Sequence, residues 1–380
     1  FKMIRLYPCT LVLLLSFLFL FQLSSNAQTW FMTNVEGELQ SFEQRRAAHA
    51  VNGTGYVVVR NFEIDTTMYE GFRDAENALP VNRNTLFQMG SMTGALTKFA
   101  VLRLVNDGIV KLDAPANNYL KSWQLDKKSF TDTDPVTVRD LLTQQRGLTN
   151  VYKPKGYAKG VATPTLLQIL NGDAPSNLPD MQLKKNKRNK KSNSMANTMV
   201  LQQLLEDVHG KDFTTIIEER VFEPLDMQRS YISADRPETG DDNIALAYDQ
   251  NNQPVAGGNL VYPELAVSGL WSTAEDYTKF VLHLFKAAKG MDNRTLDVDL
   301  AKAAIQPESG SISLVFFKNE TSYWGGAPEG YYSQFSGDAD AGWMVIATTN
   351  KQLAWQHVNW ELIPRGIDYA KRKKTSNTQP

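Results

Sequence analysis

The chain has 380 residues, of which 42% are hydrophobic and 21% charged. This is an ordinary composition for a globular protein, and it excludes collagen-like and wholly disordered chains. The length fits one large domain or two closely packed ones. Because 40 basic residues are balanced by 41 acidic ones, the net charge is -1. No global field therefore attracts the chain to nucleic acid or to a membrane, and we expect no specific nucleic-acid recognition.

The N-terminal segment is typical of a secretory signal peptide. Two basic residues precede an apolar run from Leu11 to Leu23, and Ser25-Asn26-Ala27 supplies the small residues of a cleavage site. The alternative is a retained membrane anchor, but the run is shorter than the roughly 20 residues that a spanning helix needs. The sequence thus predicts a signal peptide at 1–27 and a secreted or periplasmic mature domain at 28–380, with no membrane association after cleavage.

The only cysteine, Cys9, lies inside this predicted leader. Disulfides, thiolate catalysis and cysteine-based metal sites are therefore not expected in the mature chain. The four histidines are too scattered in sequence to indicate a metal site, so we expect neither a metal nor a cofactor. Three Asn-x-Thr sequons, at Asn52, Asn293 and Asn319, matter only in a host that glycosylates secreted proteins.

The first predicted element of the mature chain is a buried strand, Gly55 to Arg60, because this β-branched run is bounded by Gly53 and Asn61. A helix is predicted from Thr97 to Asn106, where apolar residues recur with helical spacing. Shorter helices are predicted to follow it, at Val136–Leu142, Thr165–Leu170, Met199–Val208 and Thr214–Val221.

The later elements begin with a helix from Ala274 to Phe285. Thr273 is its predicted N-cap, because Asp276 follows three residues later. Antiparallel strands and a last helix are predicted after it, at Ser313–Phe317, Tyr331–Phe335, Gly342–Thr348 and about Trp355–Tyr369. This order indicates an α/β fold of the α+β type. Its antiparallel sheet would come from about 50–85 and 310–370, and a helical region of about 90–300 would be inserted between them.

Residues 184–191 differ sharply in composition from the rest of the chain. The run carries six basic residues, Lys184, Lys185, Lys187, Arg188, Lys190 and Lys191. The remaining mature chain has 32 basic and 41 acidic residues, so the run would form a positive patch on a negative surface. One interpretation is a solvated basic loop, and the other is a site that attracts an anionic polymer.

Several short motifs occur in order along the chain. They are TLFQMGS at 85–91, LVNDG at 104–108, KLDAP at 111–115, VTVRDLL at 136–142, GLT at 147–149, FEPLDM at 222–227, YPE at 262–264, GLWSTAED at 269–276, GG at 325–326, EG at 329–330 and TN at 349–350. From about Val57 to Asn350 the chain thereby resembles the serine β-lactamase-like hydrolases, the superfamily of class C β-lactamases, D-alanyl-D-alanine carboxypeptidases and esterases. The resemblance implies an antiparallel sheet flanked by helices, an inserted helical region, and a cleft at their junction.

The resemblance also implies four chemical parts, of which this sequence keeps one. Ser91 stands at the position of the family's nucleophile, at a helix N-terminus. The lysine that the family places three residues later, on the same helix face, is Gly94 here. The relay tyrosine of the helical region is replaced by Asn193, and the basic residue of the strand motif is Trp324, in Trp324-Gly325-Gly326.

These replacements remove the groups that would activate the serine. Neither glycine nor the asparagine amide accepts a proton near neutral pH, and the tryptophan ring nitrogen is only a donor. An unassisted Ser91 hydroxyl is a poor nucleophile, and its alternative role is to cap or pack the helix start. Lys98 could stand in for the missing lysine, but it begins about 10 Å further along the helix.

Three functional hypotheses follow for the mature protein. The first is a catalytically inactive or strongly impaired relative that binds a small molecule or peptide in a cleft lined by Ser91 and the degenerate motif positions. The second is a working hydrolase of amide or ester bonds that uses Ser91. The third, compatible with the first, is a polyanion-binding protein that uses the basic run at 184–191.

Overall fold

The computed structural model describes residues 31–35, 37–126, 133–144, 148, 154–182, 195–305, 312, 314, 316–318 and 321–372. The predicted leader with Cys9, the basic run at 184–191 and Asn193 lie outside the described residues. The chain divides into two units, Phe1–Ala50 and Val51–Pro380. In the first unit, β1 (Thr33–Val35) pairs antiparallel with β2 (Glu38–Gln40), and a capping box at Ser41 opens α2 (Phe42–Ala48).

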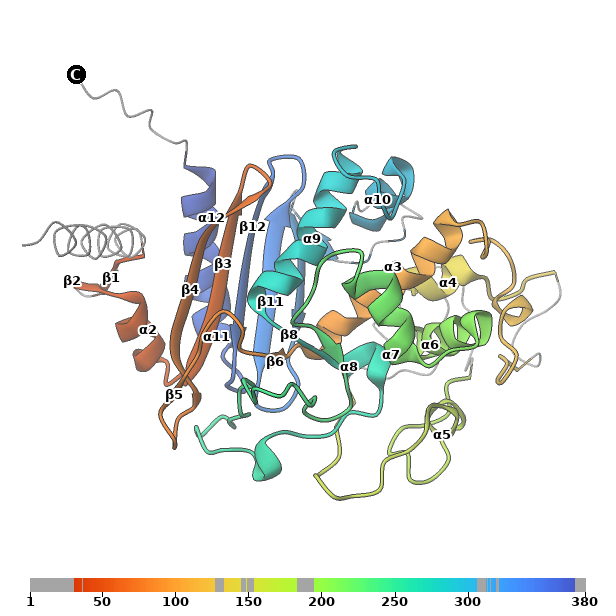
Figure 1. The fold of residues 1–380 in the computed structure, drawn as a ribbon, viewed down its shortest axis with the longest axis horizontal. Coiled ribbons are helices and arrows are strands. Elements are labelled where there is room, and N and C mark those ends of the chain that lie inside the picture. The colour runs from red at the N-terminus through yellow and green to blue at the C-terminus, as the bar shows by residue number, and fades with distance from the viewer. Residues whose placement is uncertain are drawn as a thin grey trace, which may run out of the picture. The chain divides into compact units, whose positions relative to one another are not determined.

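Among the described residues of the second unit, seven strands form one antiparallel sheet in the order β5-β4-β3-β12-β11-β10-β9 (Figure 1). In chain order these strands are β3 (Gly53–Arg60), β4 (Glu63–Asp74), β5 (Leu79–Pro80), β9 (Phe316–Lys318), β10 (Thr321–Gly326), β11 (Tyr332–Asp338) and β12 (Trp343–Thr349). The central pair, β3 and β12, joins the first and last strand-forming parts of the unit, so the complete sheet can form only when both parts are present.

Helices cover both faces of the sheet at this central pair. On one face lies α12 (Ile363–Lys371), where the Tyr56 hydroxyl donates to the Leu362 carbonyl at 2.8 Å. On the other face lies α9 (Ala274–Ala288), whose Phe280 belongs to the same apolar core as Val57 (Figure 1). Both faces are therefore shielded from water, which is why β3 contains three consecutive valines, Val57 to Val59, instead of an apolar–polar alternation.

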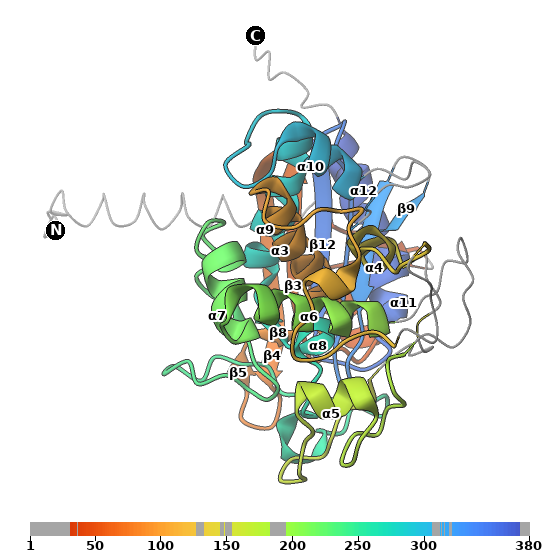
Figure 2. The same ribbon diagram turned by 90° about the vertical axis from the view of Figure 1, so that its right-hand side faces the viewer.

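The helical region lies between the early and late strands. Its elements are η1 (Gly90–Met92), α3 (Thr93–Asn106), η2 (Ala116–Asn118), α4 (Val138–Thr143), α5 (Leu166–Asn171), α6 (Ala196–His209), α7 (Phe213–Ile217), η4 (Glu218–Phe222), η5 (Ala256–Gly258), α8 (Leu265–Ser268) and α10 (Val298–Ile305). Helix α3 is buried along most of its length and packs against α9, with the rings of Phe99 and Phe280 5.5 Å apart (Figure 2). The unit ends with α11 (Trp355–His357) and η6 (Val358–Leu362), which lead into α12.

A second, small sheet holds the start of α3 in place. Its strands β6 (Phe87–Gln88), β8 (Leu270–Ser272) and β7 (Tyr231–Ile232) pair in the order β6-β8-β7. Strand β6 leads directly into η1 and α3, and the Met89 amide donates to the Leu270 carbonyl at 2.8 Å. Residues far apart in the chain thereby fix the turn that carries Ser91.

The mixed α/β class with an antiparallel sheet and flanking helices is confirmed. The predicted N-cap also occurs, since the Thr273 side chain accepts a hydrogen bond from the Asp276 amide. The sequence patterns missed β4 and β10. The side chains of β4 are mostly exposed or half-buried, so this strand lacks an apolar run. No helix within the described ranges is long and apolar enough to cross a membrane.

Candidate functional site

The turn before Ser91 brings the sheet and the helical region into contact. Gly90 has a φ of +53°, and a Cβ there would lie 2.6 Å from Pro328 Cδ. A Cβ on Gly326 would lie 1.8 Å from the Met89 carbonyl oxygen. Both positions therefore need glycine, because a side chain would push strand β10 or the segment that follows it away from the turn.

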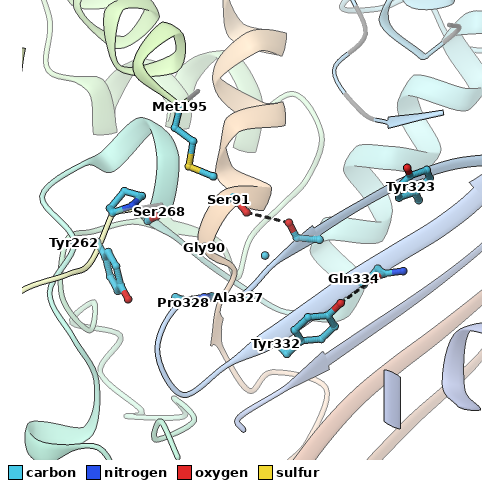
Figure 3. A pocket seen from close by; sticks show the side chains of 13 residues that line it. Gly90, Ser91, Met195, Tyr262, Ser268, Tyr323, Ala327, Pro328, Tyr332 and Gln334 are labelled. Carbon is cyan, nitrogen blue, oxygen red and sulfur yellow. Dashed lines mark hydrogen bonds between the residues drawn. The ribbon is translucent and has the colours of Figure 1, made fainter. Parts of the chain in front are cut away.

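Ser91 is half-buried at this contact, and its hydroxyl is already engaged. The Oγ atom donates a hydrogen bond to the Gly325 carbonyl at 3.0 Å (Figure 3). The N-cap residue of α3 is Met92, which makes no side-chain cap hydrogen bond. Ser91 thus links the helix start to strand β10, and the capping role that its sequence position allowed is not used.

A cavity of about 320 Å³ opens beside Ser91 (Figure 3). Its described lining comes from the η1 turn, the start of α6, the α8 region and strands β10 and β11, and comprises Gly90, Ser91, Pro154, Met195, Tyr262, Ser268, Tyr323, Gly325, Gly326, Ala327, Pro328, Tyr332 and Gln334. This volume is at the lower end of the range for small-molecule sites in proteins. Three of the predicted cleft residues, Ser91, Gly325 and Gly326, belong to this lining.

The described lining carries no acidic, basic or histidine side chain. Its ionisable groups are tyrosines, and burial raises the pKa of Tyr262 to about 12. The Tyr262 hydroxyl accepts a hydrogen bond from the Glu329 amide at 3.0 Å. Burial also raises the pKa of Tyr332, whose hydroxyl donates to Gln334 Oε1 at 2.9 Å. These two tyrosines are therefore neutral hydrogen-bonding groups at pH 7, and neither is a ready proton acceptor.

Gly94 is buried in the first turn of α3 and is not among the lining residues. A Cβ built on Gly94 would meet Thr198 Cγ2 at 3.8 Å, which is an ordinary contact. The backbone thus has room for a side chain to begin at this position. What the site lacks here is the amine, since the surrounding structure does not require glycine.

Trp324 also lies outside the lining, and its ring contacts the backbone at the nucleophile position. The indole Nε1–H donates to the Ser91 carbonyl at 2.8 Å. The register pairs Trp324 with Phe335, a residue of the apolar core. Where the resemblance implied a basic residue that faces substrate, the structure shows an aromatic ring that fixes the backbone of Ser91.

Lys98 is buried on α3, with its Nζ 5.8 Å from the centre of the Trp324 ring. Burial lowers the pKa of Lys98 to about 8. No hydrogen bond joins its amine to Ser91 among the described contacts. The described contact of the Lys98 amine is therefore with the face of the Trp324 ring and not with the Ser91 hydroxyl, so Lys98 is not placed to accept the serine proton.

A second buried ionisable group, Glu264, lies at the start of α8. It is fully buried, and neither carboxyl oxygen makes a hydrogen bond to another described residue. Burial raises the pKa of Glu264 to about 7. Its carboxylate in turn contributes to the raised pKa of Tyr262, so the two side chains are neighbours. Both residues belong to the YPE motif at 262–264, but nothing in that motif indicated that Tyr262 lines a pocket or that Glu264 is buried.

Comparison with known proteins gives this site a family context. The family model described as Beta-lactamase matches residues 39–360. Protein Rv1367c of Mycobacterium tuberculosis is 27% identical over 270 residues, which cover 65% of this chain and 66% of that protein. Esterase EstB of Burkholderia gladioli is 34% identical over 110 residues, which cover 29% of this chain and 26% of that protein. The chain thus spans slightly less than two thirds of the first of these relatives.

The fold is shared with solved structures. The D-amino acid amidase of Ochrobactrum anthropi SV3, solved in complex with D-phenylalanine, superposes with a TM-score of 0.70. The match covers 93% of this chain and 100% of the amidase at 19% sequence identity. At this identity the likeness shows a common architecture only.

Proposed function

This chain belongs to the β-lactamase family, and from that membership we propose that it is a secreted, catalytically impaired member that binds a small uncharged ligand beside Ser91. The observation that carries the proposal is the described pocket lining, which offers hydroxyls, an amide and aromatic rings but no acid, base or cation. Such a wall suits a neutral ligand with an aromatic or apolar part and a few hydrogen-bonding groups.

The same lining argues against turnover. An attacking serine needs a group that takes its proton, and the Ser91 proton points to the Gly325 carbonyl, which is not a base. The residues of such a site act as a unit, so the loss of several partners costs several orders of magnitude in rate. Loss of the amine at Gly94 and of the basic residue at Trp324 therefore predicts negligible β-lactamase and peptidase activity.

A working ester or amide hydrolase is the second candidate, and one observation favours it. Glu264 and Lys98 are buried near this region with pKa values of about 7 and about 8, and such perturbed groups are frequent at active sites. Neither group lines the pocket, and neither is hydrogen-bonded to Ser91 in the described structure. Proton transfer from Ser91 would therefore require a rearrangement that brings one of them to the serine.

Turnover of a chromogenic cephalosporin and of a short-chain p-nitrophenyl ester separates the two candidates. We expect the wild type to show no more turnover than Ser91→Ala, and we expect no covalent labelling by a fluorophosphonate or penicillin-type probe. Turnover at ordinary enzymatic rates that Ser91→Ala abolishes would contradict the proposal and establish the hydrolase.

Ligand binding is tested with a matched pair of aromatic probes, N-acetylphenylalanine amide and N-acetylphenylalanine, which differ in one negative charge. The uncharged amide is expected to raise the melting temperature of the wild type more than the carboxylate does. Ala327→Phe should remove this difference, because Ala327 is half-buried in the pocket wall and a phenyl ring there would fill the cavity. Ala162→Phe, at an exposed position outside the lining, is the control. Equal stabilisation by both probes would contradict an uncharged ligand.

A further inference from the structure

Two of the three Asn-x-Thr sequons lie in described parts of the chain, and they differ in the exposure of the asparagine amide nitrogen. Asn52 immediately precedes β3, and its Nδ2 atom, which would carry a sugar, is buried. Its Oδ1 accepts a hydrogen bond from Asn252 Nδ2 at 3.1 Å. An N-linked glycan is bulky and needs open solvent at this nitrogen. A glycan on Asn52 is therefore incompatible with the folded sheet.

Asn293 lies in the connection between α9 and α10, and its side chain is exposed. No hydrogen bond links that side chain to any residue within the described ranges. Its two neighbours are fixed instead, because Arg294 forms an ion pair with Asp292 at 2.8 Å. The backbone on either side of Asn293 is thereby held while the amide projects into water, so the fold can accept a large substituent at this atom.

The third residue of this sequon is held inside the protein. Thr295 is 3% exposed, and its Oγ1 is hydrogen-bonded to Nε2 of His283. The other ring nitrogen, Nδ1, lies 3.0 Å from Asp292 Oδ2. Burial lowers the pKa of His283, so the ring is neutral, Nδ1–H donates to the carboxylate, and Nε2 accepts the Thr295 proton. The hydroxyl that defines the sequon is thus unavailable once this loop has packed.

We propose that the folded, secreted chain carries an N-linked glycan on Asn293, that it carries none on Asn52 because a chain glycosylated there could not complete the sheet, and that the sugar is added to Asn293 before the loop packs onto α9. In this transfer Asn293 Nδ2 bonds to the anomeric carbon of a lipid-linked oligosaccharide. The bond from that carbon to the lipid pyrophosphate breaks, the amide loses one proton, and the pyrophosphate leaves with the bonding electrons. The inference rests on entry into a secretory pathway, but it is independent of any ligand in the pocket.

The test uses the full chain behind a strong secretory signal in a glycosylating eukaryotic host, so that import does not depend on residues 1–27. All variants carry Asn319→Gln, because that sequon lies outside the described residues. In the secreted, folded protein we expect one endoglycosidase-sensitive glycan, lost in Asn293→Gln and unchanged in Asn52→Gln. A glycan that persists in Asn293→Gln, or its absence from the parent protein, would overturn the assignment.

The pair Thr295→Ser and Thr295→Val tests the sequon hydroxyl, and transfer of the sugar in vitro tests the timing. The serine variant keeps the sequon hydroxyl and should keep the glycan, whereas the valine variant should lose it. Unglycosylated protein, folded in a bacterial cytoplasm, should then receive no sugar from purified transferase and lipid-linked oligosaccharide, while the urea-unfolded protein should accept it. Equal modification of the folded and unfolded forms would refute the order of events.

Discussion

Replacement of Lys98 by methionine is expected to stabilise the protein, although it removes a charged residue from the neighbourhood of the site. Lys98 is 4% exposed, and its described interaction is with the Trp324 ring, with no carboxylate beside it. Burial lowers its pKa from 10.5 to about 8. At neutral pH, this difference corresponds to about 3 kcal/mol of free energy that the folded state loses by keeping the buried amine protonated.

Two effects oppose each other in Lys98→Met. Methionine is of similar length and removes the desolvation cost, but it also removes a buried cation–π contact worth about 1–2 kcal/mol. The net expectation is a gain of about 1–2 kcal/mol in the free energy of unfolding at pH 7.5. Because the folded pKa lies below the unfolded one, the wild type binds fewer protons when folded between pH 8 and 10.5. Its stability relative to the variant therefore rises over that window.

The measurement is urea unfolding followed by far-ultraviolet circular dichroism at pH 7.5 and near pH 10.5. Lys302→Met, at an exposed position on α10, is the matched control and should show a small difference at both pH values. A clear destabilisation by Lys98→Met at pH 7.5, or a difference from wild type that does not change with pH, would refute a buried amine whose desolvation cost exceeds the gain from its contact with Trp324.

Three further predictions concern the missing amine, the basic run and the leader. Gly94→Lys should fold, since the added Cβ makes only an ordinary contact. It should recover little turnover of the cephalosporin or the ester, because Asn193 and Trp324 still lack the relay and the basic group; a large recovery would contradict this. The mature protein should bind a heparin column more tightly than a variant with the six basic residues of 184–191 changed to glutamine. Elution of both proteins at the same low salt concentration would contradict binding of an anionic polymer by this run. Mass spectrometry of secreted protein should find a mature N-terminus near Gln28, and an intact Leu11–Leu23 segment would indicate an anchor.

Local signals in the sequence were sufficient to predict several helices and strands. The N-cap at Thr273 and the helix after it depend on residues within one turn, so their pattern is complete in the sequence. Strand β3 could be recognised because both its faces are buried. Strand β4 could not, because its mostly exposed and half-buried residues become a strand only through pairing with β3.

The sequence by itself determined that Ser91 stands where a nucleophile is expected and that the groups to activate it are absent, because residue identity alone decides whether an amine or a base is present. The resemblance placed Trp324 and Gly325 at the cleft, but only the tertiary structure decided which contacts the serine makes. Tyr262 in the pocket wall, the Gly325 carbonyl that accepts the Ser91 proton and the Trp324 ring on its carbonyl all come from segments more than 170 residues away. Such contacts depend on how the strands and helices pack, and no local pattern encodes them.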